Sequence, residues 1–238
     1  QLGELAYPRH QHASVLFEDS ENPLLFVYGG YGGSLGAPYV KFTAEFCRVL
    51  ASPEAFRIRN STRSLRRLKM NQDSTLPGPR RGLEMVAGLD SGMAENTALL
   101  IAGTRKEPTP DPFATNQAAS CRTGYLLQLK DNGRGYLLLE WIPAGRLVQE
   151  TLQPGVARLP GGRILIVGGR DHGGLAVMEA SIFDPVTGAL EKVCKSLAHD
   201  PWQDFLTQHA SSTWGGAFIF GVDTKSRQSR GILFEASR

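Results

Sequence analysis

The segment from Leu159 to Gly174, LPGGRILIVGGRDHGG, places two adjacent glycines after a short apolar run, as a phosphate-binding loop does. A phosphate loop leads into the N-terminus of a helix and carries a lysine followed by serine or threonine. Neither feature follows Gly168 and Gly169 in this sequence. Glycines at the end of a strand adopt positive φ and let two backbones approach closely. The pair therefore predicts a tight exit from a β-strand instead of a nucleotide site.

Two other groups of residues have types suited to chemistry. His10 and His12 are two positions apart, so on a strand both side chains face the same side and could share a metal ion, but no acidic ligand lies near them in the sequence. Asp171 and His172 could form an acid–base pair, although the polarity of a loop is the simpler explanation. The sequence contains no HExxH or GxSxG motif. We therefore expect no catalytic residue, no bound metal and no cofactor.

The composition is that of a globular chain with a core. Of the 238 residues, 41% are hydrophobic and 21% are charged. The net charge of +3 is mildly basic and falls short of the dense basic stripe typical of nucleic-acid-binding proteins. Cys47, Cys121 and Cys194 are odd in number and far apart, which argues against a disulfide framework or a zinc site.

Targeting signals are also missing from the sequence. No apolar run reaches the roughly 18 to 20 residues of a membrane span. The first ten residues, QLGELAYPRH, lack the basic end and the apolar core of a signal peptide. Together with the unpaired cysteines, these features favour an intracellular compartment, and a secreted location stays open.

Short apolar runs bounded by turn residues dominate the chain, which indicates many β-strands. Four segments repeat one pattern, in which two strands flank a turn and a glycine mark closes the second strand. The pattern is clear from His12 and from Gly155, and it is weaker from Gly82 and from His209, where Ala102 and Val222 replace glycines. The marks of the repeat are His12, Gly29, Gly30, Gly103, Gly168, Gly169, His209 and Gly221.

A loop and further strands follow each glycine mark. In the first copy these strands are FTAEFCRVL and AFRIR, and in the third they are MEASIFDP and ALEKV. Two hairpins joined by a loop form one four-stranded antiparallel blade, and such blades bury their faces by packing around an axis. The expected blades are residues 7–60, 78–143, 150–194 and 205–238. The last copy ends after a third strand, so residues 1–6 are expected to complete it.

Two of the copies carry the features of a kelch repeat: a basic residue and a histidine before the first strand, two glycines after the second, and an aromatic residue in the fourth. PRHQHASVLF with LLFVYGG, and LPGGRILIVGGRDHGG with EASIFDPVTG, follow this pattern. The sequence resembles a kelch-repeat β-propeller, including the galactose-oxidase-like style of repeat. The resemblance implies an all-β propeller of about four blades, either as one domain over residues 1–238 or as a segment of a larger ring. It says little about chemistry.

Loops on such a scaffold are the expected binding elements. The loop 103–120 is rich in proline and polar residues, and a second loop brings Trp202 and Phe205 next to acidic residues. The linker NSTRSLRRLKMNQDSTLPGPRR is basic, with leucines interleaved, so it could also form a short amphipathic helix. The candidate binding residues are Arg63, Arg66, Arg67, Lys69, Arg80, Arg81, Arg170, Asp171, His172, Trp202 and Phe205.

These features predict a non-catalytic protein-binding or scaffold module, with a protein partner and a place in a larger assembly. Two alternatives stay open. A propeller enzyme acting on a carbohydrate or related small molecule requires acidic and aromatic residues that converge at one end of the axis. An RNA-associated subunit would use the basic segment from Arg63 to Arg81, and its affinity would fall steeply with salt.

Overall fold

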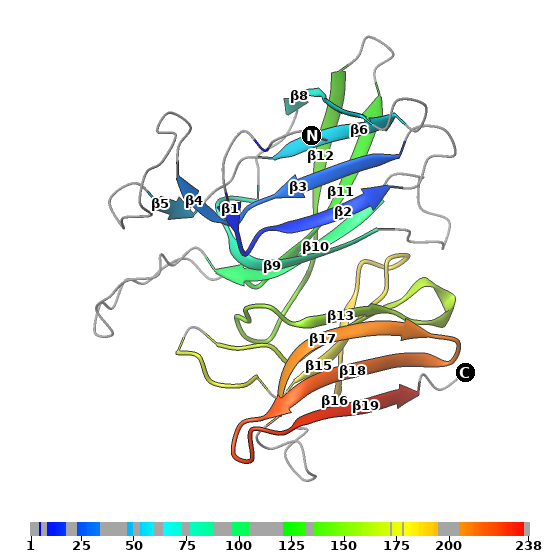
Figure 1. The fold of residues 1–238 in the computed structure, drawn as a ribbon. Coiled ribbons are helices and arrows are strands. Elements are labelled where there is room, and N and C mark those ends of the chain that lie inside the picture. Colours follow the sequence, from blue (N-terminus) through cyan, green and yellow to red (C-terminus); the bar gives the residue numbers. More distant parts are fainter. Residues whose placement is uncertain are drawn as a thin grey trace.

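The structure is a computed structural model, which describes residues 5, 9–17, 23–33, 47–49, 53–59, 64–72, 77–87, 97–104, 121–131, 136–171, 173–177, 179–194 and 205–235. In this part of the chain the elements are β-strands and one 3-10 turn, η1 (Pro160–Gly162), with no α-helix. Figure 1 shows the sheets following one another from the upper half of the molecule to the lower half. The predicted all-β fold is confirmed.

Four main sheets, here called blades I to IV, follow one another along the chain. Blade I contains β2 (Ala13–Phe17), β3 (Leu24–Tyr28), β6 (Glu54–Arg59) and β7 (Ser64–Arg67). Blade II contains β9 (Arg81–Ala87), β10 (Thr97–Thr104), β11 (Thr123–Asp131) and β12 (Tyr136–Arg146). Blade III contains β13 (Gly155–Arg158), β14 (Ile164–Val167), β15 (Ala180–Phe183) and β16 (Leu190–Cys194). Blade IV has three described strands, β17 (Phe205–Thr213), β18 (Gly216–Asp223) and β19 (Ser229–Glu235).

Over residues 64–72, which the structure describes, the basic linker forms strands and not a helix. Its first part is β7, which completes blade I, and its second part is β8 (Lys69–Gln72), which adds to blade II parallel to β12. Between them, the N–H of Leu68 donates to the carbonyl of Ala55 at 2.9 Å. Leu68 and Met70 are partly buried against the core shared by blades I and II. The two sheets provide hydrogen-bond partners for the backbone groups of β7 and β8. The segment therefore links blades I and II at their outer edges.

The strands of blade I differ from those expected in one place. The third strand is β6, which contains the expected AFRIR, and β7 is the fourth. The described end of FTAEFCRVL is β5 (Cys47–Val49), which pairs instead with β4 (Tyr31–Gly33) in a small sheet that also holds β1 (Arg9–His10). The chain enters this small sheet directly after the Gly29-Gly30 turn, because β4 begins at Tyr31.

Apolar clusters join each blade to the next. The cluster between blades I and II includes Phe26, Leu100 and Leu127, and the one between blades II and III includes Ile101 and Ile164. The cluster between blades III and IV includes Leu165, Phe205 and Ile219. The innermost strands are in contact in the order β2, β9, β13 and β17. Side chains that alternate along each strand therefore bury both faces of the middle blades.

A recurring hydrogen bond ties the start of each of the first three blades to its own glycine turn. A side chain just before the first strand donates to the carbonyl at the first turn position: Arg9 Nη1 to Gly29 (2.9 Å), Arg80 Nη1 to Ala102 (3.2 Å) and Thr151 Oγ1 to Gly168 (2.9 Å). The next residue in the turn reaches the following blade, because the N–H of Gly30 donates to Arg80 O at 2.7 Å and that of Gly103 to Thr151 O at 2.9 Å.

The turns themselves have left-handed backbone conformations. The φ angles of their two positions are 71° and 95° at Gly29 and Gly30, 65° and 90° at Ala102 and Gly103, and 63° and 92° at Gly168 and Gly169. The predicted strand exit by paired glycines is thus confirmed in blades I and III. In blade II, Ala102 occupies the glycine position, as the sequence indicated, at a conformation that L-residues rarely adopt.

Blade IV lacks this turn. Neither Gly221 nor Val222 has a positive φ, and both lie within β18. The chain turns back directly at Asp223, whose Oδ1 accepts hydrogen bonds from the N–H groups of Lys225 (3.1 Å) and Ser226 (2.7 Å). Among the described residues β19 pairs with β18 alone. The strand expected from residues 1–6 lies outside the described residues, apart from Leu5.

Candidate binding surfaces

The exposed part of the predicted basic segment lies along the outer edges of blades I and II. Arg66 and Arg67 on β7 and Lys69 on β8 are exposed. Arg67 Nη2 lies 3.6 Å from Glu54 Oε2, and Lys69 Nζ lies 5.8 Å from the centre of the Tyr136 ring. We call Arg66, Arg67 and Lys69 the basic edge. Arg63 lies outside the described residues.

Arg80 is separate from the basic edge, because it is only 1% exposed. Its Nη1 donates to the carbonyls of Ala102 (3.2 Å), Cys121 (3.4 Å) and Thr123 (2.9 Å), and its guanidinium lies 5.1 Å from the centre of the Tyr125 ring. Hydrogen bonds to carbonyls and contact with an aromatic face stabilise a buried cation. Arg80 therefore stabilises the interior of blade II by hydrogen bonds.

Arg81 is half-buried at the start of β9. Its Nη1 donates to Gln11 Oε1 at 3.0 Å, which connects blade II to the residue before β2. Burial lowers the pKa of its guanidinium from the ordinary value, which still leaves the group charged at neutral pH. The predicted basic segment thus divides into the exposed basic edge, Arg80 inside blade II, and Arg81, which connects blades I and II.

The loop after the Gly168-Gly169 turn uses its acidic residue for its own shape. Asp171 Oδ1 accepts hydrogen bonds from the N–H groups of Gly173 (2.8 Å) and Leu175 (2.9 Å). Arg170 is exposed, and its backbone exchanges hydrogen bonds with Leu152 at 2.9 and 2.7 Å. Such an Asx turn gives the loop a fixed shape. His172 lies outside the described residues, so the acid–base pair stays a prediction.

Of the two aromatic residues proposed for binding, Trp202 lies outside the described residues. Phe205 begins β17 and is buried in the cluster between blades III and IV. Its ring packs under Gly221, where an added Cβ would lie 2.5 Å from Phe205 Cζ. Phe205 therefore contributes to the core.

The two histidines near the N-terminus have different surroundings. His10 is exposed and meets the Tyr31 ring edge-on, with 5.3 Å between ring centres. His12 is partly buried, and burial together with nearby Arg9 lowers the pKa of its imidazole. Its buried Nδ1 has no hydrogen-bond partner among the described residues. In that part of the chain no three potential ligands gather as a metal site would require. His209, the mark of the fourth copy, is exposed on β17.

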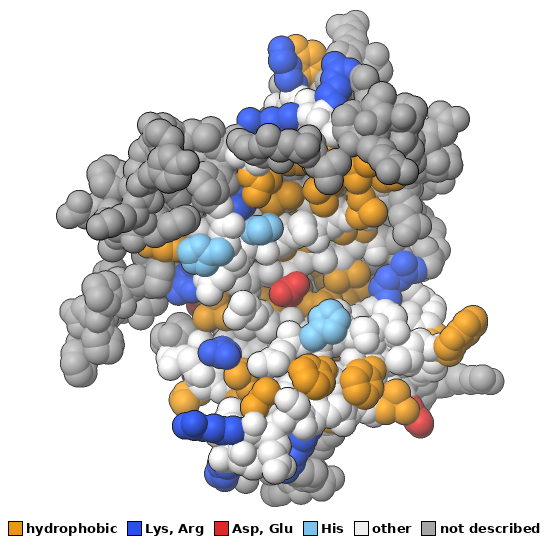
Figure 2. Space-filling view, viewed as in Figure 1, with side chains coloured by type: hydrophobic (Ala, Val, Ile, Leu, Met, Phe, Trp, Pro, Cys, Tyr) orange, Lys and Arg blue, Asp and Glu red, His pale blue; other side chains and the backbone are white. Residues whose placement is uncertain are grey.

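Glu84 is a further ionisable group on an innermost strand. It lies on β9 opposite Ile101, and burial raises the pKa of its carboxyl to about 7. No charged neighbour contributes to this shift. Figure 2 shows acidic and histidine side chains near the centre of this face of the molecule, between the upper and lower blades. The described residues give Glu84 no charged partner with which to form an acid–base pair.

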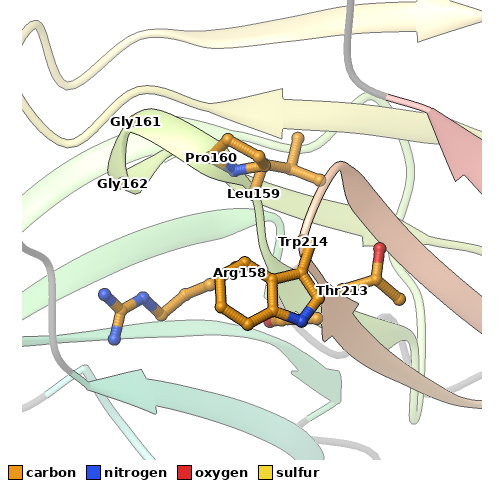
Figure 3. Close-up of a pocket in the computed structure, with 8 residues that line it drawn as sticks. Arg158, Leu159, Pro160, Gly161, Gly162, Thr213 and Trp214 are labelled. Carbon is orange, nitrogen blue, oxygen red and sulfur yellow. The ribbon is translucent and has the colours of Figure 1, made fainter.

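A groove opens between blades III and IV. It is about 590 Å³ in volume and is lined by Arg158 to Gly162, from β13 and the turn after it, and by Ser212 to Trp214, from the end of β17. Figure 3 shows the Trp214 indole at the tip of the β17–β18 turn, with Leu159 and Pro160 of blade III beside it. Trp214 is fully exposed. We call this the Trp214 groove.

The outer face of blade IV is also apolar. Phe218 and Phe220 on β18 are 42% and 39% exposed, and Leu233 on β19 is 59% exposed. Phe218 pairs with Leu233 across the two strands. Figure 2 shows hydrophobic side chains grouped on the lower half of the visible face. The loop predictions did not include these residues, although a Trp directly before Gly215 and Gly216 in SSTWGGAFIF is a visible signal for an aromatic side chain at a turn.

Comparisons with known proteins address the fold. No protein-family model matches the chain, and no curated protein matches it. A solved structure described as "Structure of YjhT" is similar, with a TM-score of 0.54 and 15% sequence identity over 90% of this chain. This chain spans 59% of the length of that structure. No described helix has the length and apolarity of a membrane span. The fold of the chain is an all-β propeller arrangement of four blades.

Proposed function

We propose that the chain is a non-catalytic protein-binding module, a kelch-type propeller that acts as a subunit of a larger assembly. The observation that carries this proposal is the fully exposed Trp214 at the rim of the groove between blades III and IV. An indole gains more from burial than most side chains, and tryptophan is enriched among residues that dominate protein interfaces. Exposed apolar surface that is rimmed by polar residues is a common feature of protein interaction sites.

The surroundings of Trp214 resemble the layout of a protein interface. Leu159 and Pro160 provide an apolar wall, while Arg158, Ser212 and Thr213 provide polar groups at the rim. Both walls come from tight turns on blades whose shared core is closely packed. A groove held by such turns loses little conformational entropy when a partner binds, so more of the contact energy appears as affinity.

The proposal is tested by purifying the chain with whatever binds it and measuring affinity for the stoichiometric partner. We expect Trp214→Ser to weaken binding by about 30-fold or more, as truncation of a tryptophan hot spot does. Val186→Ser is the matched control, because Val186 is an exposed apolar residue on the β15–β16 turn of blade III. Equal affinity of the Trp214 variant and the wild type would contradict the proposal.

An RNA-associated role is the second candidate, supported by the basic edge. Three exposed cations lie on consecutive outer strands. The test is charge reversal of Arg66→Glu with Lys69→Glu, which leaves the Arg67 contact with Glu54 in place. For RNA binding we expect a loss of affinity and a shallower dependence on salt, by about 0.7 in log–log slope for each single-strand phosphate contact removed. Unchanged binding would remove this candidate.

A further inference from the structure

The second strand of each blade shows which faces of the blade are suited to burial. β10 and β14 are the second strands of the two middle blades, and all of their residues are buried. Both contain a run of consecutive apolar residues, ALLIA in β10 and ILIV in β14. Such a run is typical of a strand that is covered on both faces, whereas a strand with one face in water alternates apolar and polar residues.

β18, the second strand of blade IV, has a sequence of the first kind. Phe218, Ile219 and Phe220 follow one another at its centre. Ile219 is buried in the cluster with blade III, while Phe218 and Phe220 lie on the outer face and are 42% and 39% exposed. The sequence of β18 is thus suited to burial on both faces, and the structure buries one of them.

The outer face of blade IV is one continuous apolar surface across its strands. Phe218 lies opposite Leu233 of β19, and its ring covers Gly231, where an added Cβ would overlap the ring. At the other end of the face, Leu206 of β17 lies opposite Val222 of β18, and both are partly exposed. The surface therefore extends over all three described strands of the blade.

This face also carries few charges. Arg230 and Asp223 form an ion pair at 3.2 Å, and alternation along the strands places both on the side of blade III. On the outer side of β18 and β19 the charged residue is Glu235, at the last position of β19. Burying an unpaired charge costs free energy, so a face with its one charge at the margin is suited to being covered.

The interfaces between the blades indicate what kind of unit covers such a face. In each of the three, an apolar cluster fills the space between two neighbouring sheets, and the inner face of blade IV takes part in the third. Repeat proteins stack each unit on its neighbours, and a terminal face that remains in water is normally polar. The similar propeller structure is longer than this chain, which spans 59% of its length.

We propose that the outer face of blade IV packs against a further blade of the same kind, so that blades I to IV form part of a larger ring. The occupant is a four-stranded antiparallel sheet with apolar residues on the face that meets β18 and β19. Its packing buries Phe218, Phe220 and Leu233 in a fourth cluster, as the third cluster buries Ile219. The Trp214 groove lies on the other side of blade IV, toward blade III, so this interface is independent of the proposed function.

Photo-cross-linking in the source cells identifies what covers the face. The variant Phe220→Bpa carries the photoreactive residue p-benzoylphenylalanine (Bpa) on the outer face, and peptide mass spectrometry reads the cross-linked segment. We expect peptides from outside the sequence of residues 1–238 that contain an apolar strand ending in paired glycines, as in blades I and III. Val186→Bpa is the matched control, because Val186 is exposed on the β15–β16 turn, and it should not cross-link to that segment.

A second position makes the result independent of one variant. Leu233→Bpa, at the most exposed apolar position of the outer face, should cross-link to the same further blade as Phe220→Bpa. Cross-links from both positions to a segment without the repeat pattern would overturn the proposal. Cross-links to residues 13–28 of blade I, in the same chain or in a second copy, would overturn it as well, as would the absence of any cross-link from both positions.

Discussion

Blades I to III and blade IV differ in how they use the end of their second strand. In the first three blades a side chain before the first strand donates a hydrogen bond to a carbonyl in a left-handed turn. The turns of blades I and II also donate a hydrogen bond to the next blade. In blade IV the second strand continues through Gly221 to Asp223, and the chain returns at once as β19. Blade IV also exposes three large apolar side chains, Trp214, Phe218 and Leu233. The difference supports the proposal that the partner binds at blade IV.

The largest expected effect comes from breaking the turn of blade III. Gly168→Ala places a Cβ where it overlaps the Thr207 hydroxyl of blade IV, at a φ of 63°. We expect a loss of about 4 kcal/mol in the free energy of unfolding, measured by urea denaturation. Gly215→Ala is the control, because a Cβ there meets open space. Similar stability of the two variants would show that the turn does not hold blades III and IV together.

Removing the buried guanidinium of Arg80 should have the next largest effect on the free energy of unfolding. Arg80→Met leaves three backbone carbonyls without their donor, and we expect a loss of about 3 kcal/mol in the free energy of unfolding. Arg66→Met changes an exposed side chain on the basic edge and should alter stability by less than about 0.5 kcal/mol. Equal stability of the Arg80 variant and the wild type would contradict the assignment of Arg80 to the interior.

Glu84 tests the environment of the innermost strands through pH. Its pKa rises from 4.5 to about 7 on folding, so the folded chain favours the protonated carboxyl. Its contribution to stability is therefore fully present below pH 4.5 and is lost as pH rises through 7. Between pH 4.5 and pH 7 the free energy of unfolding of the wild type should fall by about 2 kcal/mol relative to that of Glu84→Gln. Urea denaturation at a series of pH values measures this difference. If the free energy of unfolding depends on pH in the same way for both proteins, the carboxyl of Glu84 is exposed to solvent and the burial assigned to it is wrong.

The smallest expected effect is a gain in the free energy of unfolding, where the preceding variants give a loss. Ala102→Gly gives blade II the glycine that blades I and III have at this position, where φ is 65°. Relief of the left-handed strain outweighs the extra freedom of glycine in the unfolded chain, so we expect a gain of about 0.5 kcal/mol. Thermal unfolding followed by circular dichroism measures it. A loss of stability would show that the methyl group of Ala102 contributes packing that exceeds the strain.

The turns and the blade order could be predicted from sequence because they depend on local signals. Paired glycines after apolar runs gave the positions of two turns, and the weaker second copy placed Ala102 correctly. The role of Arg80 could not be predicted, because a lone arginine in a basic run is normally exposed. FTAEFCRVL was misassigned because pairing partners that lie far apart in sequence decide which apolar run joins a sheet. The apolar surface of blade IV depends on which face of each strand the packing leaves exposed, which a linear pattern does not encode.

The most direct test of the difference between blade IV and the other blades is amide hydrogen exchange, resolved by peptide, in the dilute chain and in its purified assembly. Association through blade IV predicts that exchange slows in residues 205–235 and in the Pro160–Gly162 turn, while β3, β10 and β14 stay unchanged. Slowing confined to residues 64–72 would contradict this assignment and would favour the basic edge. Exchange that is identical in both samples would contradict it as well.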